Sequence, residues 1–207
     1  MNPKPTIHVV DDDEAMRDSL VWLLDDDRYQ VRTYVSGEDF LERRAASVPA
    51  CIILDIRMPG MSGVEVHERL VRDGVSTPVV FVTGHGDVPM AVEAIKRGAF
   101  DFIEKPFNEQ KLTGIIERAI EHDAEVAGRS AAASEIAARL ARLSPREREV
   151  LDLVVAGKMN KTIADVMNIS IKTVEAHRAK VMEKMGARSL AELVQSVMRA
   201  AEPAARA

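Results

Sequence analysis

A run of five residues, Cys51-Ile52-Ile53-Leu54-Asp55, constrains the fold of this chain more than any other stretch. It is continuously apolar until it ends in a carboxylate, and the turn residues Pro59-Gly60 follow shortly after. A run this short and apolar is typical of a strand buried on both faces, as in a parallel sheet. Asp55 would then stand at the carboxyl end of its strand, which is the edge where open α/β sheets bind ligands.

Three further short, mainly apolar runs are also followed directly by polar side chains. They are residues 7–10 before Asp11 and Asp12, residues 79–82 before Thr83, and residues 100–103 before Glu104 and Lys105. If the strands are parallel, these polar ends meet at one edge of the sheet.

Segments with helical spacing alternate with strands, including one at residues 30–35, up to about Gly128. Five such β-α units predict an α/β fold, a doubly wound five-stranded parallel sheet with helices on both faces. The handedness of crossovers favours the flavodoxin-like order 2-1-3-4-5. We expect Cys51 and Trp22 in its core, and Asp87 as the cap of a helix that runs to Arg97.

The pattern breaks at Gly128, after which small residues dominate. We predict a first domain over residues 1–127 and a second over residues 143–207. Residues 128–142 are expected to form a partly helical linker, because their alanines favour helix while Gly128 interrupts the preceding one.

Helix caps predict that the second domain is all-helical. Ser144 begins a capping box, and Asn160, Ser170 and Ser189 are the expected caps of three more helices. The tight turn at Asn168-Ile169 joins the second helix to the third. This arrangement predicts a helix-turn-helix.

The net charge of -5 hides an asymmetry between the two halves. From Glu135 onward there are 13 Lys and Arg against 9 Asp and Glu, whereas the preceding residues have 15 against 24. The basic second half is therefore the candidate for binding a polyanion such as DNA. A single cysteine and the lack of a signal-like or membrane-spanning run predict a cytoplasmic protein with no membrane partner.

The acids at the sheet edge, Asp11, Asp12 and Asp55, would repel one another unless a cation lay among them. Oxygen ligands from two loops suit Mg²⁺. Lys105 and Thr83 add an ammonium and a hydroxyl that can neutralise the oxygens of a transferred phosphoryl group. Asp55 is therefore the expected phosphoacceptor.

At this point the motifs resemble those of a known family. The chain is similar to bacterial two-component response regulators of the FixJ type, with a receiver domain and a LuxR/FixJ-type helix-turn-helix. The resemblance covers nearly the whole chain and rests on the segments Val10-Asp11-Asp12-Asp13-Glu14, Asp55 with Met58-Pro59-Gly60-Met61-Ser62-Gly63, Thr83-Gly84-His85 and Lys105-Pro106-Phe107.

The resemblance implies a role for each matching residue of the first domain. Asp12, Asp55 and the main-chain carbonyl of Arg57 would hold Mg²⁺, and Asp11 would act largely through water. Thr83 and Lys105 would hold the phosphoryl oxygens, and Lys105-Pro106 would be a cis peptide bond.

The resemblance also implies a switch and partners. Phe102 would turn inward on phosphorylation, and the chain would form a phosphorylation-dependent homodimer. A sensor histidine kinase would supply the phosphoryl group, and the dimer would bind promoter DNA and contact RNA polymerase, as an activator. The interface candidates are Val92, Ile95, Lys96 and Asp101, with further contacts of the second domain around residues 193–198.

In the third helix of the second domain, Val174, His177, Val181 and Met185 recur at spacings of three and four, which marks a buried stripe. The remaining side chains are free to enter a major groove or meet phosphates. The DNA-contact candidates are Lys158, Asn160, Lys161, Lys172, Thr173, Glu175, Ala176, Arg178 and Ala179.

Other functions remain open at this stage. An aspartyl-phosphate phosphatase would need an acid two residues after Asp55, where this chain has Arg57, so we expect no dedicated enzyme beyond slow self-dephosphorylation. A flavin carrier is disfavoured because acids after the first strand repel a cofactor phosphate. A DNA-binding protein whose receiver works without phosphorylation is a further alternative.

Overall fold

The structure is a computed structural model that describes residues 4–25, 27–44, 49–84 and 88–201. The chain divides into two compact units, Met1–Val126 and Ala127–Ala207, which we call the first and the second unit. Each is described here by itself.

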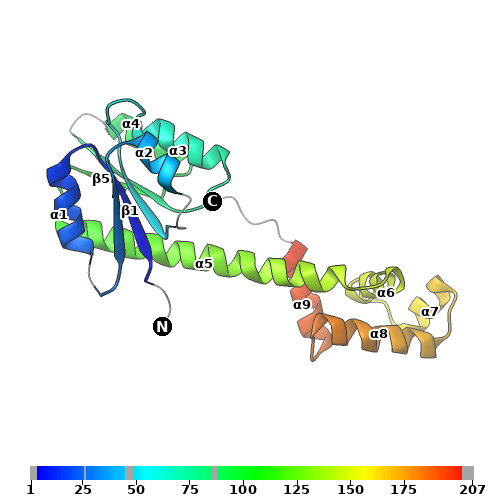
Figure 1. Ribbon diagram of the computed structural model, residues 1–207. Coiled ribbons are helices and arrows are strands. Elements are labelled where there is room, and N and C mark those ends of the chain that lie inside the picture. Colours follow the sequence, from blue (N-terminus) through cyan, green and yellow to red (C-terminus); the bar gives the residue numbers. More distant parts are fainter. Residues whose placement is uncertain (1–3, 26, 45–48, 85–87, 202–207) are drawn as a thin grey trace. The chain divides into compact units, whose positions relative to one another are not determined.

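The first unit is built on a parallel sheet with the strand order β2-β1-β3-β4-β5, as predicted (Figure 1). The strands are β1 (Thr6–Val10), β2 (Gln30–Tyr34), β3 (Cys51–Asp55), β4 (Val79–Thr83) and β5 (Asp101–Glu104). Val10 pairs with Leu54, and Thr83 pairs with Glu104. The residues that follow these pairs therefore meet at one edge.

In the part of the first unit that the structure describes, five helices cover the two faces of this sheet, so the predicted α/β fold is confirmed. They are α1 (Glu14–Leu24), α2 (Gly37–Arg43), α3 (Gly63–Arg72), α4 (Val88–Lys96) and α5 (Glu109–Ala141). Leu20 of α1 and Leu112 of α5 belong to the core on one face, while Phe40 of α2 and Leu70 of α3 belong to the core on the other.

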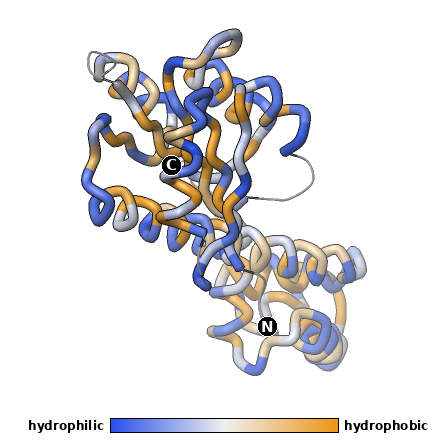
Figure 2. Tube along the Cα trace, turned by 60° about the vertical axis from the view of Figure 1, so that its left-hand side comes forward, coloured by the Kyte–Doolittle hydropathy of each residue, from blue (hydrophilic) through white to orange (hydrophobic). Residues whose placement is uncertain are grey.

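Burial on both faces explains why β3 and β4 are apolar at nearly every position. All five residues of each strand are buried. Successive side chains point to opposite faces, so Ile53 packs with α1 and α5 while Ile52 and Leu54 pack with α2, α3 and α4. In Figure 2, hydrophobic segments run through the interior of the first unit, and hydrophilic ones are common on its outside.

Trp22 is not in the core, contrary to the prediction. Its side chain is 82% exposed, whereas Leu20 and Leu24 on the same helix are fully buried. Each residue turns an α-helix by about 100°, so a position two residues after Leu20 faces away from the sheet. Cys51 is buried as expected. The predicted cap Asp87 lies outside the described residues.

The last helix of the first unit does not end at Gly128. α5 runs unbroken from Glu109 to Ala141, and the division between the two units falls within it. The prediction that Gly128 interrupts the helix is therefore wrong. One glycine costs about 1 kcal/mol relative to alanine, and the alanine-rich residues around it favour the helix enough to outweigh that cost.

Up to residue 201, the last that the structure describes, the second unit contains the end of α5 and four further helices. These are α6 (Pro145–Val155), α7 (Asn160–Met167), α8 (Ile171–Met185) and α9 (Leu190–Ala201). Ser144 and Ser170 cap α6 and α8 as predicted. Asn160 does not cap α7: it is the first helical residue, and Met159 before it offers no side-chain hydrogen bond. Between α7 and α8, Asn168 adopts the left-handed conformation with φ 53°.

The core of the second unit also includes part of the predicted linker. Val150, Ile163 and Val174 are fully buried in it, and Ile136 and Leu140 of α5 pack against it. The guanidinium of Arg139 donates a hydrogen bond of 2.6 Å to the carbonyl of Met185 at the end of α8. The end of α5 therefore packs as part of the second unit and is not a separate linker.

A partly buried ion pair joins the start of α6 to the end of α8. Glu147 is only 4% exposed. Its carboxylate accepts hydrogen bonds from the Lys184 ammonium at 2.6 Å and the Ser144 amide at 2.7 Å. The hydrogen bond from Lys184, followed by that from the Ser144 main chain, lowers the pKa of Glu147 to about 2.

Among the described residues, no helix has the length and apolar character needed to cross a bilayer.

The Glu147 pair should make the second unit sensitive to acid. A carboxylate with a lowered pKa stabilises the fold above its ordinary pKa of 4.5, and this contribution is lost as the pH falls toward about 2. Glu147→Gln should therefore speed amide hydrogen exchange in α6 and α8 at pH 7, with little difference from the unaltered chain near pH 2. Glu149→Gln, which removes an exposed partner of Arg146, is the matched control. Equal protection of the α6 and α8 amides in Glu147→Gln and Glu149→Gln at pH 7 would contradict the prediction.

Candidate functional site

The predicted acidic residues converge at the carboxyl edge of the sheet. Asp11 and Asp12 follow β1 and Asp55 ends β3, and one carboxylate oxygen of each lies within 4.8 Å of the other two. We call these three residues the acidic cluster. Asp11 and Asp55 are buried, with exposed fractions of 2% and 8%, whereas Asp12 is exposed. The cluster is therefore open to solvent on the side of Asp12.

Local hydrogen bonds hold the β1–α1 end of the cluster. Asp11 accepts a hydrogen bond of 2.9 Å from the Asp13 amide, and Asp13 caps α1 by accepting from the Ala15 amide. The guanidinium of Arg17 donates to the main-chain carbonyl of Asp11 at 2.8 Å. Arg17 was not among the predicted site residues, because a basic residue in the first turn of a helix does not by itself indicate a site.

Lys105 brings a positive charge into the cluster. Its Nζ lies 2.9 Å from Asp11 and 3.4 Å from Asp55. The main-chain amide of Lys105 donates to the carbonyl of Thr83, which extends the β4–β5 pairing to this position. The Lys105-Pro106 bond is cis, as predicted. The structure thus shows Lys105 bridging two acids, with Asp11 the nearer.

The single positive charge of Lys105 does not balance the three carboxylates of the acidic cluster. The pKa values of Asp55 and Lys105 are both raised. Burial is the main cause that raises the pKa of Asp55; the charge of Lys105 opposes it, and the charge of Asp11 adds to it. Burial alone would lower the pKa of Lys105, but its hydrogen bond to Asp11 and the charge of Asp55 outweigh burial, so that pKa is raised. The cluster keeps an excess of negative charge.

This donor set fits a hard divalent cation. Carboxylate oxygens from two strand ends are the ligands that Mg²⁺ prefers, and the exposed side of Asp12 leaves room for the water molecules that Mg²⁺ retains. The main chain of Arg57 also lies at the site, because its amide hydrogen bond is one of the influences that lower the pKa of Asp55. A cation here would relieve the repulsion between the carboxylates that Lys105 alone does not neutralise.

Thr83 is the last residue of β4, and Phe102 lies within β5. The Thr83 side chain is fully buried, and its hydroxyl donates 3.0 Å to the carbonyl of Gly84. Phe102 is half-buried and pairs in register with Phe81. The hydroxyl of Thr83 is therefore engaged locally and would have to turn to reach a ligand on Asp55.

The interface candidates lie on or next to α4 and β5. Val92 is 42% exposed and Lys96 is exposed, while Ile95 is half-buried. Lys96 lies 3.6 Å from Glu93. Asp101 pairs with Arg118 of α5 at 2.8 Å.

In the second unit, α8 presents a buried side and an exposed side. Val174, Val181 and Met185 are buried, and the predicted His177 is half-buried. The DNA-contact candidates are all exposed or half-buried: Lys158, Asn160, Lys161, Lys172, Thr173, Glu175, Ala176, Arg178 and Ala179.

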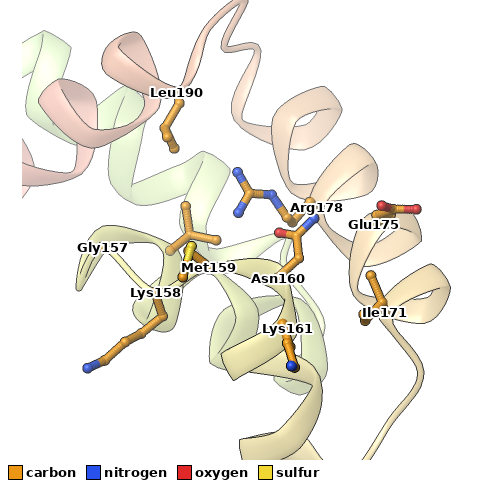
Figure 3. Close-up of a pocket in the computed structure, with 10 residues that line it drawn as sticks. Gly157, Lys158, Met159, Asn160, Lys161, Ile171, Glu175, Arg178 and Leu190 are labelled. Carbon is orange, nitrogen blue, oxygen red and sulfur yellow. The ribbon is translucent and has the colours of Figure 1, made fainter.

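Several of these candidates surround one shallow hollow of about 600 Å³ (Figure 3). Asn160 and Lys161 come from the start of α7, Lys158 comes from the residues just before it, and Glu175 and Arg178 come from α8. The hollow also contains Met159, whose apolar side chain is 75% exposed. The helix-turn-helix thus gathers cationic side chains from two helices around a common surface.

Family comparisons agree with both units. The response regulator receiver domain matches residues 7–117, and the family of bacterial regulatory proteins of the luxR type matches residues 141–197. The chain belongs to the response regulators. Its function is phosphorylation-dependent regulation of transcription through a luxR-type DNA-binding domain.

Named relatives cover almost the whole response regulator. The transcriptional regulatory protein FixJ of Bradyrhizobium diazoefficiens is 48% identical over 97% of this chain and 98% of its own length. The tetrathionate response regulatory protein TtrR of Salmonella typhimurium is 45% identical over 97% of this chain and 96% of its own. Both are regulators rather than dedicated enzymes.

Two solved structures are similar over both units. A low-resolution structure of the response regulator StyR has a TM-score of 0.85 and 42% identity, and covers 95% of this chain and 100% of its own. Full-length FixJ from B. japonicum has a TM-score of 0.61 and 47% identity, with coverages of 98% and 100%. Receiver domains bind Mg²⁺ at an acidic pocket, and the acidic cluster supplies one here.

The charge excess predicts that the cation-free response regulator is destabilised by its own site. Because the folded state raises the pKa of Asp55, its ionisation costs stability as the pH rises from the ordinary carboxyl range through the raised value. With EDTA at pH 7, Asp55→Asn should raise the free energy of unfolding of the first unit by about 1 kcal/mol. The gain should become small near pH 3, where the Asp55 carboxyl is largely protonated in both the folded and the unfolded state.

Chemical denaturation followed by circular dichroism measures this difference. Asp18→Asn, which alters an exposed carboxylate on α1, is the control and should leave the stability unchanged. An Asp55→Asn variant less stable than the unaltered chain in EDTA at pH 7 would contradict the prediction.

Proposed function

We propose that Asp55 accepts a phosphoryl group from a sensor histidine kinase. One observation carries this proposal: Asp55 is a buried carboxylate that lies within reach of Asp11, Asp12 and Lys105 at the carboxyl edge of the sheet. A nucleophilic carboxylate beside a cation-binding site and an ammonium has the groups that phosphoryl transfer requires.

In the proposed reaction an oxygen of Asp55 attacks the phosphorus of a phosphohistidine. The new O–P bond forms as the P–N bond breaks, and the histidine leaves with the electron pair of that bond. Asp12, Asp55 and the carbonyl of Arg57 would hold Mg²⁺, with Asp11 acting through water. When bound, Mg²⁺ would neutralise charge on the transferred oxygens.

Lys105 and Thr83 would hold the phosphoryl oxygens. Lys105 already lies between Asp11 and Asp55, so it can exchange one carboxylate for a phosphoryl oxygen without leaving the site. Thr83 would give up its hydrogen bond to Gly84. We propose that Phe102 then turns inward, so that the local charge change biases a two-state element.

The phosphorylated chain is proposed to form a homodimer through α4 and β5, with Val92, Ile95, Lys96 and Asp101 at the interface. The exposed apolar surface of Val92 and the exposed ammonium of Lys96 support this choice. Of the contacts proposed on α9, Leu193 is only 2% exposed because it packs in its own unit's core. Met198, at 60% exposure, is the more accessible residue.

The second unit, proposed as the DNA-binding domain over residues 143–207, would place α8 in the major groove of promoter DNA. Residues 1–127 form the proposed receiver. Ala176 and Ala179 are small enough to let the helix approach base edges, and Glu175 could accept from cytosine. At the start of α7, which lacks a side-chain cap, main-chain amides beside Lys158 and Lys161 suit a DNA phosphate.

We further propose that the DNA-bound dimer acts as an activator that contacts RNA polymerase. The relatives that support this are transcriptional regulators by name, including the C4-dicarboxylate transport regulator DctR of Rhodobacter capsulatus at 45% identity. Because promoter DNA and the catalytic side of a sensor kinase meet in the cytoplasm of bacteria, that compartment is the proposed site of action.

Phosphoryl acceptance can be tested with acetyl phosphate and Mg²⁺ as the donor system. The unaltered chain should gain one phosphoryl group, measured as one mass increment in intact-protein mass spectrometry. Asp55→Asn should gain none, because an amide is not a nucleophile for this reaction. Sedimentation of the same samples should show a shift to dimer for the phosphorylated chain alone.

Asp18→Asn is the control, since its exposed carboxylate lies on α1 and is not part of the acidic cluster. It should be labelled like the unaltered chain. Equal labelling of Asp55→Asn would place the phosphoryl group on another residue and overturn the proposal.

DNA contact by α8 can be tested through its salt dependence. If Arg178 meets a phosphate, Arg178→Ala should weaken binding and reduce the slope of log affinity against log salt by about 1 unit. Fluorescence anisotropy with labelled promoter DNA across a salt series measures both quantities. Arg146→Ala, which removes an exposed cation from α6, is the control. An unchanged slope for Arg178→Ala would remove this residue from the phosphate contacts.

A further inference from the structure

The loop that follows β3 packs against the start of α2. This loop, residues 56–62, is referred to here as the β3–α3 loop. The carboxylate of Glu38 on α2 accepts a hydrogen bond of 2.8 Å from the main-chain amide of Met61. Gly60 lies so near that a Cβ on it would be 2.7 Å from the same carboxylate oxygen. A side chain at position 60 would therefore push Glu38 and the loop apart.

A second close approach lies one residue before Glu38. A Cβ on Gly37 would stand 2.5 Å from the Val66 side chain and 3.2 Å from the carbonyl of Met61. The backbone of α2 is thus in direct contact with the end of the loop and the start of α3. This contact brings the Glu38 carboxylate within hydrogen-bonding distance of the loop.

The β3–α3 loop is anchored at both of its ends. At its base the Gly63 amide donates 3.0 Å to the carbonyl of Ile56, and a Cβ on Gly63 would collide with the Asp55 carbonyl at 2.0 Å. At its far end, Ser62 and Glu65 form the capping box of α3. The hydrogen bond from Met61 to Glu38 adds a tie from outside the loop.

The segment held in this way contains a proposed ligand. Arg57 is the second residue after Asp55, and its main-chain amide already faces the Asp55 carboxylate. Its carbonyl is the one main-chain oxygen in the proposed Mg²⁺ site. The position of that carbonyl depends on the backbone of the loop, since no side chain of Arg57 can adjust it.

We propose that Glu38 is a positioning residue for the cation site: its carboxylate holds the β3–α3 loop so that the Arg57 carbonyl is presented to a divalent cation bound by the acidic cluster. This inference rests on the proposed function of the cluster. A loop that is already ordered loses less conformational freedom when its carbonyl binds the ion, so the tie should favour binding. Hydrogen bonds from the main-chain amides of Glu38 and Met61 lower the pKa of Glu38, so the acceptor is charged at neutral pH.

Glu38 could instead serve only α2, as an acidic residue in its first turn. That role would stabilise the helix without changing the affinity for a cation. The two roles differ in their effect on Mg²⁺ binding, and Glu42 provides the matched control. It is an exposed acid on the same helix, and its replacement changes the net charge by the same amount.

The experiment is calorimetric titration of the full chain with Mg²⁺ alone, without a phosphoryl donor. Glu38→Ala should raise the dissociation constant about three- to tenfold. This is less than the full loss of a hydrogen bond to a charged acceptor, because Glu38 acts on the ion only through the loop. Glu38→Gln keeps an acceptor oxygen and should lie between Glu38→Ala and the unaltered chain. Glu42→Ala should bind Mg²⁺ like the unaltered chain.

Amide hydrogen exchange without Mg²⁺ gives an independent readout. Exchange at Met61 should be faster in Glu38→Ala than in Glu42→Ala, while the exchange of β3 should be the same in both. Should Glu38→Ala fail to fold, the same comparison between Glu38→Gln and Glu42→Gln decides the question.

The outcomes separate this inference from the proposed function. If Glu38→Ala binds Mg²⁺ as tightly as the unaltered chain, the positioning role is overturned while the cation site stands. An equal loss of affinity in Glu38→Ala and Glu42→Ala would reduce the effect to net charge and would also overturn it. If the unaltered chain takes up no Mg²⁺, the proposed cation site fails, and the role of Glu38 fails with it.

Discussion

The electrostatic imbalance at the carboxyl edge of the sheet underlies the rest of this structure. Three carboxylates lie within 4.8 Å of one another, two of them buried, and one ammonium stands among them. In a site of reduced dielectric, such like charges repel more strongly than in water. A divalent cation relieves the repulsion, and a phosphoryl group on Asp55 would again change the charge that Lys105 has to balance. The same imbalance can therefore explain both cation binding and the response to phosphorylation.

Several elements of the first unit hold this edge of the sheet in place. The buried strands fix Asp11, Asp55 and Lys105 through the register of a sheet covered on both faces. Side chains of α1 and α2 reinforce it: Arg17 donates a hydrogen bond to the carbonyl of Asp11, and Glu38 accepts one from the amide of Met61. In the second unit, Glu147 likewise makes two contacts: it accepts a hydrogen bond from the amide of the cap Ser144 and pairs with Lys184 at the end of α8.

Patterns that repeat along the chain were read correctly from the sequence. The order of the strands, the convergence of Asp11, Asp55 and Lys105, and the caps at Ser144 and Ser170 follow from period, turn residues and the handedness of crossovers. Three local predictions were wrong. Trp22 was expected in the core because it is hydrophobic, but its position around α1 leaves it exposed. α5 continues through Gly128, and Asn160 lies inside α7 rather than at its cap.

The sequence by itself determined that this chain has a parallel α/β unit with an acidic edge and a helical unit that resembles a DNA-binding module. Both conclusions depend on regular spacing, which reflects the geometry of strands and helices directly. Only the tertiary structure decided that Lys105 lies nearer to Asp11 than to Asp55, that Thr83 is turned toward Gly84, and that Glu38 reaches the loop after β3. These contacts join residues whose separation along the chain has no fixed period, so they are set by how the packed elements approach one another.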